Sequence, residues 1–454
     1  MIFEILTMLA RRIGLDKSIA YSSGARIVQA FAGLFSIFFI AQFLSKEEQG
    51  YYYTFGSILA IQVFFELGLT SIITQFVAHE AAHLNIEDKQ VTGEPLYMSR
   101  LASLLQFCIK WYVVLSIVLL IVLTIAGVVF FAYYNDKSID VEWKLPWLLL
   151  VIGTTIKLFQ SPFTSLLMGI GRIKEMSKIM FYQQIIIPLS MWTGLIFGLK
   201  LYVVGISSIL SVLIWSIYVY KSSLWSLLKS IYRITVTEKV GYMSEIFPMQ
   251  WRIALSWISG YFIFQLFNPV LFATEGPIVA GQMGMSLQVL NGITSLSMAW
   301  MSTKVPLYSS LIELKKYIEL DSVFNKTLIQ MFSICVMLVV TMLICVGILQ
   351  ATGIKLGNVV LGDRFLPLFA ILILSSTVLL QSIVSSWAIY LRSHKQEPYL
   401  ITSIVSGILC CISTLGCGKL WGLYGIIIGY FVVTLVMLFW NHYIYCIKKQ
   451  EWHG

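Results

Sequence analysis

The stretch Trp111–Tyr134, WYVVLSIVLLIVLTIAGVVFFAYY, runs for 24 residues without a charged side chain. A helix that crosses the hydrocarbon core of a membrane needs about 20 mostly apolar residues, so this stretch predicts a spanning helix. The whole chain of 454 residues has the same character, with 58% hydrophobic and only 12% charged residues. A soluble domain carries about twice that charged fraction. The composition excludes a disordered chain, a secreted disulfide scaffold and a nucleic-acid binder, and it predicts an all-α, multi-pass membrane protein.

Eleven further stretches share this length and apolar character, which makes twelve predicted spans. An even number of spans places both termini on the same side of the membrane. The predicted spans lie near residues 18–44, 50–78, 111–134, 145–168, 177–199, 201–220, 249–272, 277–303, 327–350, 365–391, 398–417 and 421–446.

The distribution of basic residues predicts on which side of the membrane the two termini lie. With cytoplasmic termini, 21 of the 31 Lys and Arg residues fall in inside segments, 7 in outside loops and 3 within spans. The positive-inside rule therefore predicts cytoplasmic termini, and most of the net charge of +9 reflects topology. The polar segments near 79–110 and 304–326 both lie inside. We expect them to be extensions of spans or helices lying on the membrane surface.

The chain also contains an internal repeat. A shift of 221 residues aligns Leu145–Pro146 with Leu366–Pro367, and Gln160–Ser161 with Gln381–Ser382. Such a repeat is the signature of a duplicated architecture.

Six spans per half give the two halves the same orientation, so the predicted fold has two six-helix lobes related by a pseudo-two-fold axis along the membrane normal. The predicted lobes are residues 1–220 and 249–454, joined by a basic cytoplasmic linker at 221–248. Transporters built from such repeats bind their substrate between the repeats.

Four charged residues lie within predicted spans: Arg26, Glu66, Lys157 and Arg252. Each costs about 2.5–3.5 kcal/mol at a helix centre on insertion scales, and such residues normally face a bundle interior or a wet cavity. Three cations against one anion predict a positively charged cavity that attracts anions. Arginine also matches the geometry of phosphate. The alternative is that Glu66 pairs with Arg26 or Lys157 to fix helix register, while Arg252 reaches the cytoplasmic edge.

Polar residues at helical spacing extend these positions into stripes. They form the predicted polar lining of the path, which consists of Gln29, Gln62, Glu66, Gln160, Ser161 and Ser256.

One segment matches a metal-binding pattern. His79–Glu80–Ala81–Ala82–His83 reads HExxH, which binds zinc when two histidines lie one turn apart on a helix. A third ligand is needed, and Glu87 is eight residues from His79, about 12 Å along a helix. We therefore expect a polar helix end rather than a zinc site. The seven cysteines form no CxxC pair, and we expect no metal, cofactor or catalytic residue.

Three segments carry a resemblance to a known family: LSKEEQGYY at 44–52, FFELGL at 64–69 and PMQWRIALSW at 248–257. They resemble bacterial polysaccharide flippases, which handle O-antigen and capsule repeat units. These flippases belong to the multidrug/oligosaccharidyl-lipid/polysaccharide exporter superfamily. Elsewhere the resemblance is mainly one of hydropathy and span number.

The resemblance implies a transporter that moves an undecaprenyl-diphosphate-linked oligosaccharide from the inner to the outer leaflet of the bacterial cytoplasmic (inner) membrane. It implies that Arg26, Lys157 and Arg252 engage the diphosphate or acidic sugars, with Lys304 at the cytoplasmic entrance. Other polysaccharide-assembly proteins are compatible partners. Because the chain has no nucleotide-binding motif, we expect an H⁺ or Na⁺ gradient as the energy source, with Glu66 as the coupling candidate.

Two other functions remain open. A cation-coupled multidrug exporter of the same superfamily would be expected to line its cavity with carboxylates, and one Glu against three basic residues argues against it. Membrane-embedded glycan polymerases and ligases resemble proteins with a large external loop, which the predicted topology lacks.

Overall fold

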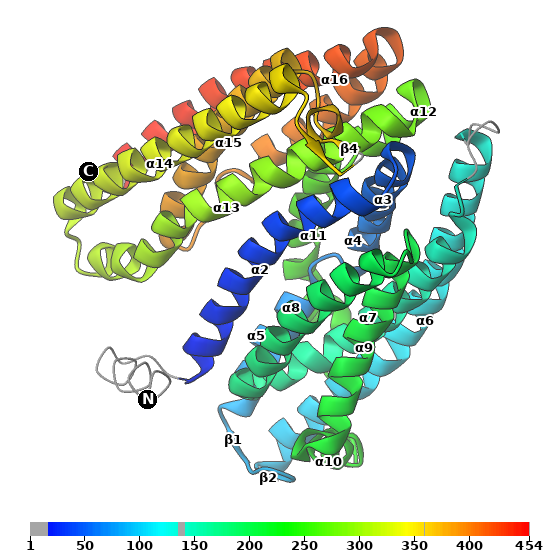
Figure 1. Cartoon of the computed structure of the whole chain (residues 1–454). Coiled ribbons are helices and arrows are strands. Elements are labelled where there is room, and N and C mark those ends of the chain that lie inside the picture. The colour runs from blue at the N-terminus through cyan, green and yellow to red at the C-terminus, as the bar shows by residue number, and fades with distance from the viewer. Residues whose placement is uncertain (1–16, 135–140, 358, 454) are drawn as a thin grey trace, which may run out of the picture. The chain divides into compact units, whose positions relative to one another are not determined.

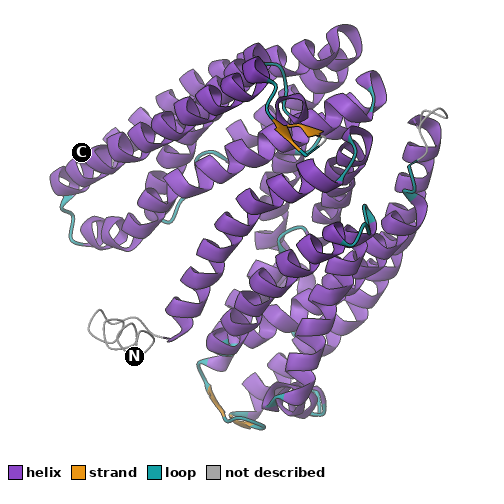
Figure 2. Cartoon of the chain, viewed as in Figure 1, coloured by secondary structure: helices purple, strands orange, loops and turns teal. Residues whose placement is uncertain are grey.

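The computed structural model describes residues 17–134, 141–357 and 359–453, and helices dominate this part of the chain (Figure 2). Within it, seven helices are long and apolar enough to cross a membrane. The number is eight if the bent pair Lys46–Glu66 and Leu69–Ala81 counts as one span. The prediction of a helical, multi-pass membrane protein is therefore confirmed.

The described residues pack into two compact units. The N-terminal unit consists mainly of residues 17–36, 61–133 and 142–254, and the C-terminal unit mainly of residues 37–60 and 255–453. Residues 37–60 thus pack with the second half of the chain, although they lie within the predicted first lobe. The predicted lobe boundaries and lobe symmetry stay predictions.

The N-terminal unit is built around α7 (Lys144–Gly169), which packs against α5 (Leu69–Ala81) and α9 (Tyr202–Lys221). The helix α8 (Ile173–Ile196) packs against α9. Trp147 of α7 is 1% exposed and donates from Nε1 to the Leu123 carbonyl at 3.2 Å. Elements with residues in this unit (Figure 1) are α2 Lys17–Phe43, η1 Ala60–Gln62, α4 Val63–Glu66, α5 Leu69–Ala81, β1 Leu84–Ile86, β2 Val91–Gly93, α6 Pro95–Tyr134, α7 Lys144–Gly169, α8 Ile173–Ile196, α9 Tyr202–Lys221, α10 Ser223–Tyr232, η2 Tyr242–Ile246 and α11 Phe247–Phe264.

The C-terminal unit is organised around α13, which contacts α3, α12, α14 and α15. The strands β3 (Lys355–Leu356) and β4 (Val359–Val360) pair in antiparallel fashion. Besides the ends of α2 and α11, its elements (Figure 1) are α3 Lys46–Leu59, α12 Phe267–Glu275, α13 Pro277–Glu313, α14 Tyr317–Thr352, β3 Lys355–Leu356, β4 Val359–Val360, η3 Leu361–Arg364, α15 Leu368–Ser393 and α16 Leu400–His453.

Glycines allow α3 and α13 to cross in close contact. A Cβ added to Gly50 would lie 2.0 Å from the carbonyl oxygen of Pro277, and one added to Gly281 would lie 2.8 Å from the Gly50 nitrogen. Small residues are the usual means by which helices approach closely within a membrane. The start of α3 is held by a capping box between Ser45 and Glu48.

Breaks in the helices test three of the predicted spans. The predicted span 50–78 is wrong as one helix, because Leu67 (φ 47°) and Gly68 (φ 70°) take left-handed conformations and end α4 before α5 begins. The predicted division between the spans 398–417 and 421–446 is confirmed, because α16 consists of two helical parts with a kink at Gly422 (φ 56°). There the Leu423 N–H donates to Glu275 of α12.

The polar segments near 79–110 and 304–326 contain the ends of long helices. α6 begins at Pro95 and continues without a break to Tyr134, and α13 runs on to Glu313. These segments were predicted to be either extensions of spans or helices on the membrane surface. For α6 and α13, the extension is correct.

Candidate functional site

Glu66 lies at the break in the second predicted span. It is the last residue of α4, directly before Leu67 and Gly68 in their left-handed conformations. A left-handed φ at a leucine costs about 1–3 kcal/mol, and strain of this kind clusters at functional sites. The Thr70 hydroxyl donates to Glu66 Oε1 at 2.7 Å across the break. The break therefore presents a half-buried carboxylate whose position one hydroxyl fixes.

Two tyrosines of the N-terminal unit carry polar groups in its interior. Tyr112 of α6 is fully buried, and its hydroxyl has no hydrogen-bond partner among the described residues. Tyr242 donates its hydroxyl to Gln250 of α11 at the short distance of 2.5 Å. The sequence suggested no role for either tyrosine.

The two described cations of the predicted spans are exposed. Lys157 lies near the middle of α7 and Arg252 lies in the first half of α11. In the described part of the chain, no ion pair joins either of them, or Glu66, to an oppositely charged side chain. The Arg252 guanidinium lies 5.5 Å from the Trp251 ring centroid, a cation–π contact. The alternative in which Glu66 pairs with Lys157 is therefore not what the structure shows.

The other predicted site residues have varied surroundings. The Arg26 side chain lies outside the described residues. Gln29 and Lys304 are exposed, and Gln62 and Ser256 are half-buried.

Gln160 has a packing role in the N-terminal unit. Its side chain is 7% exposed, and Nε2 donates to Ser216 Oγ at 2.8 Å and to the Val212 carbonyl at 3.2 Å, both on α9. The amide therefore joins α7 to α9.

The HExxH segment does not form a zinc-binding arrangement. α5 ends at Ala81, so His83 lies beyond the helix, where its ring stacks on Tyr97 at 4.1 Å. Glu80 instead accepts a hydrogen bond from Arg100 Nε at 2.9 Å. No group of three or more His, Cys, Asp or Glu residues within the described ranges is placed to hold a metal ion.

The same arginine binds a second carboxylate, Glu245, through Nη2 at 2.6 Å. Glu245 also accepts the Gly241 backbone N–H at 2.8 Å. The Gly241 N–H and the Arg100 guanidinium hold the pKa of Glu245 below its ordinary value. Because the folded-state pKa is depressed, the stabilisation is present above the unfolded pKa, about 4.3, and is lost as pH falls through the folded pKa.

Glu245→Gln is expected to lower the Tm of the purified protein by about 2 °C near pH 7, because a part-exposed ion pair contributes modestly. The difference from the wild type should shrink as the pH falls below about 4. Differential scanning fluorimetry across this pH range measures it. Glu313→Gln, an exposed carboxylate at the end of α13, is the control. A Tm gap that stays constant with pH would contradict this assignment.

The C-terminal unit contains a cavity of about 690 Å³ that was not among the predicted sites. Its wall comes from α3, α11, α12, α13, α15 and α16, with Gln265 between α11 and α12, and none of its lining residues is charged. The lining residues with side-chain amides are Gln265, Asn268, Gln288, Asn291 and Gln381. The aromatic ones are Tyr53, Phe264, Phe267 and Tyr430.

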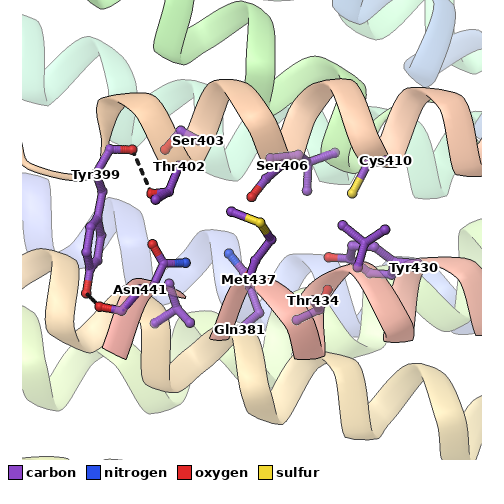
Figure 3. A pocket seen from close by; sticks show the side chains of 13 residues that line it. Gln381, Tyr399, Thr402, Ser403, Ser406, Cys410, Tyr430, Thr434, Met437 and Asn441 are labelled. Carbon is purple, nitrogen blue, oxygen red and sulfur yellow. Dashed lines mark hydrogen bonds between the residues drawn. The ribbon is translucent and has the colours of Figure 1, made fainter. Parts of the chain in front are cut away.

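A smaller cavity of about 70 Å³ shares Gln381 and Tyr430 with the large one. Thr402, Ser403 and Ser406 from the first part of α16 face Asn441 and other residues from its second part (Figure 3). Tyr399 closes one end by donating its hydroxyl to the Asn441 carbonyl at 2.8 Å. This space is large enough for water molecules that would meet the hydroxyls and amides.

A sequence signal for the large cavity did exist. Gln265 and Asn268 are three residues apart, as are Gln288 and Asn291, so a helical reading of the sequence puts each pair on one face of a predicted span. Amides in a membrane need hydrogen-bond partners, and paired amides at this spacing indicate a wet or ligand-binding face. These amides carry no charge, so they stand out less in the sequence than the charged residues of the spans do.

No family model and no curated protein match the sequence. Solved structures do match. A multidrug resistance MATE family transporter of the MOP superfamily, in its inward-facing conformation, is similar with a TM-score of 0.61 at 15% identity. That match covers 94% of this chain and 95% of the other.

The lipid II flippase MurJ in an inward closed conformation has a TM-score of 0.55 at 13% identity, covering 94% of this chain and 87% of the flippase. A MOP superfamily transporter from Pyrococcus furiosus has a TM-score of 0.51 at 16% identity, covering 97% of each chain. At such identities the likeness shows the fold. The chain therefore has the fold of MOP superfamily transporters.

Proposed function

We propose that this chain is a flippase that moves an undecaprenyl-diphosphate-linked oligosaccharide from the inner to the outer leaflet of the bacterial cytoplasmic membrane. The observation that carries the proposal is the exposure of Lys157 and Arg252 within predicted spans, with no ion pair to either in the described part of the chain. Unpaired cations at membrane depth are costly, so they indicate an anionic substrate that they meet in transit. A lipid-borne diphosphate supplies that charge.

The fold supports transport rather than catalysis, because the structures that share it are those of transporters. One of them is a lipid II flippase, which supports a lipid-linked substrate for this chain. Arg26 and Lys304 extend the proposed cationic path, with Lys304 at its cytoplasmic entrance and both termini in the cytoplasm.

Glu66 is the proposed site of coupling to an H⁺ or Na⁺ gradient. It is a half-buried carboxylate at a helix break, and Thr70 supplies a second oxygen beside it. The outward movement of a net anion is also favoured by an inside-negative potential, by about 2.3 kcal/mol per charge per 100 mV.

Glu66→Gln is expected to remove most of the stimulation of flipping by an ion gradient, about tenfold, because the neutral amide cannot exchange a proton or balance a bound cation. Flipping of a fluorescent lipid-diphosphate sugar in liposomes, with and without a pH or Na⁺ gradient, measures this effect. Glu313→Gln serves as control. A Glu66→Gln protein that still responds fully to both gradients would exclude Glu66 as the coupling site.

A multidrug exporter is the second candidate function, and the fold shared with a multidrug resistance transporter favours it. The two functions are separated by reconstituting the purified chain in liposomes and comparing transport of a cationic dye with flipping of a lipid-diphosphate sugar. We expect the lipid-linked sugar to move and the dye to stay. Dye transport without movement of the lipid-linked sugar would overturn the flippase proposal.

A further inference from the structure

The large cavity of the C-terminal unit differs in chemistry from the cationic residues of the N-terminal unit. Its volume is about 690 Å³, and all residues that line it lie in the C-terminal unit. Its polar lining consists of amides and hydroxyls, without a Lys, Arg, Asp or Glu side chain. A charged ligand buried there would lose its hydration without gaining a counter-charge, so the lining favours an uncharged ligand.

Three of the lining amides have capacity for a ligand. The side chains of Gln265, Asn291 and Gln381 form no hydrogen bond with any part of the chain that the structure describes. Each amide offers two donors and one acceptor oxygen. Because lipid cannot satisfy these groups, they require water or a polar ligand in the cavity.

A fourth amide belongs to the cavity wall. Asn268 is 7% exposed, and its Nδ2 donates to Ser57 Oγ at 3.2 Å. Its Oδ1 is buried and has no partner among the described residues. A buried acceptor without a partner costs about 1–3 kcal/mol, so the wall has an unmet demand for a hydrogen-bond donor at this position.

Aromatic rings complete the wall. Phe264 is 46% exposed, and Tyr53 and Tyr430 also line the cavity. The Tyr53 hydroxyl donates to Gln288 Oε1 at 2.6 Å, which fixes both side chains in the wall. Aromatic faces provide apolar contact area beside the polar amides.

We propose that this cavity binds the uncharged sugar residues of the transported glycan, and that it favours neutral over acidic sugars; this inference rests on the proposed flippase function. Sugar hydroxyls both donate and accept hydrogen bonds, as the amides do, and the C–H faces of the rings match the aromatic side chains. An apolar drug would leave the amides unpaired, and a cationic drug would find no carboxylate among the lining residues. The cavity volume of about 690 Å³ lies within the range of about 300–1,000 Å³ that is usual for small-molecule sites, and it suits a short oligosaccharide.

The test compares the binding of three lipids to the full-length chain in nanodiscs. They are undecaprenyl diphosphate, the same carrier bearing a neutral N-acetylglucosamine, and the carrier bearing glucuronic acid. We expect the wild type to bind the neutral glycolipid about tenfold more tightly than the bare carrier, and the acidic one with no such gain. The variant Asn291→Leu/Gln381→Leu should lose the tenfold gain and bind the bare carrier as before.

The control is Gln330→Leu, which replaces an exposed amide of α14 outside both cavities and should keep the gain. The substituted amides make no hydrogen bond to described residues, and leucine is close to them in size, so we expect the double variant to fold.

The inference is overturned if the double variant keeps the gain in affinity from the neutral sugar. It is also overturned if the acidic sugar gives the wild type an equal gain in affinity. If the chain binds the bare carrier but gains no affinity from either sugar, the inference about the cavity is overturned and the flippase proposal stands. No binding of any carrier overturns the proposed function as well.

Discussion

Replacing Lys157 and Arg252 together with alanine is expected to reduce flipping of a lipid-diphosphate sugar about a hundredfold. Hydrogen bonds to charged groups are worth about 1.5–3 kcal/mol each, and about 1.4 kcal/mol corresponds to a tenfold change. Each single substitution should therefore cost about tenfold. Flipping is measured as the accessibility of a fluorescent glycolipid to an external quencher in liposomes that contain equal amounts of each protein.

Two comparisons separate the role of these cations from a general loss of charge. Lys229→Ala removes an exposed lysine of α10 and should leave flipping unchanged. Arg252→Lys keeps the charge but loses the bidentate geometry of guanidinium, so its rate should fall between those of the wild type and Arg252→Ala. Wild-type flipping by the double alanine variant would remove both residues from the mechanism.

Gly50→Ala is expected to destabilise the protein by about 3 kcal/mol, the upper end of the usual cost of overpacking. The new methyl would lie 2.0 Å from the Pro277 carbonyl oxygen, which belongs to the backbone and cannot rotate away. α3 and α13 would have to move apart, and α13 is the central helix of the C-terminal unit. Thermal unfolding in detergent, followed by circular dichroism, measures the loss as a lower Tm.

Gly56→Ala on the same helix is the matched control. A Cβ at Gly56 would have no atom within 4 Å, so the substitution should be neutral or raise stability by up to about 1 kcal/mol through helix propensity. Equal Tm values for Gly50→Ala and the wild type would show that the crossing of α3 and α13 tolerates a wider spacing.

Residues that the internal repeat aligns share their local structure in the two halves of the chain, but not their neighbours. The aligned prolines Pro146 and Pro367 lie at the starts of α7 and α15, where proline fits because the first helical N–H groups have no partner within the helix. The aligned glutamines differ. Gln160 binds α9 in the N-terminal unit, whereas Gln381 lines both cavities of the C-terminal unit. Equivalent positions thus share local structure but not neighbours.

The charged site residues could be predicted from the sequence, because a charged side chain within a predicted apolar span is conspicuous. Glu66, Lys157 and Arg252 were predicted in this way. The sequence did not show that Glu66 lies at a helix break, where it binds Thr70. Tyr112 and Tyr242 were not singled out, because a tyrosine in a membrane protein is common at interfaces and carries no separate signal.

The sequence by itself determined that this is a helical membrane protein and roughly where each helix runs. Those features depend on apolar length and on backbone hydrogen bonds that every lipid-facing segment must satisfy within itself. Only the tertiary structure decided that residues 37–60 pack with the C-terminal unit, and that five amides line one uncharged cavity. Helical periodicity shows which side chains share a face, but the partner of that face is set by packing between helices that are far apart in the chain.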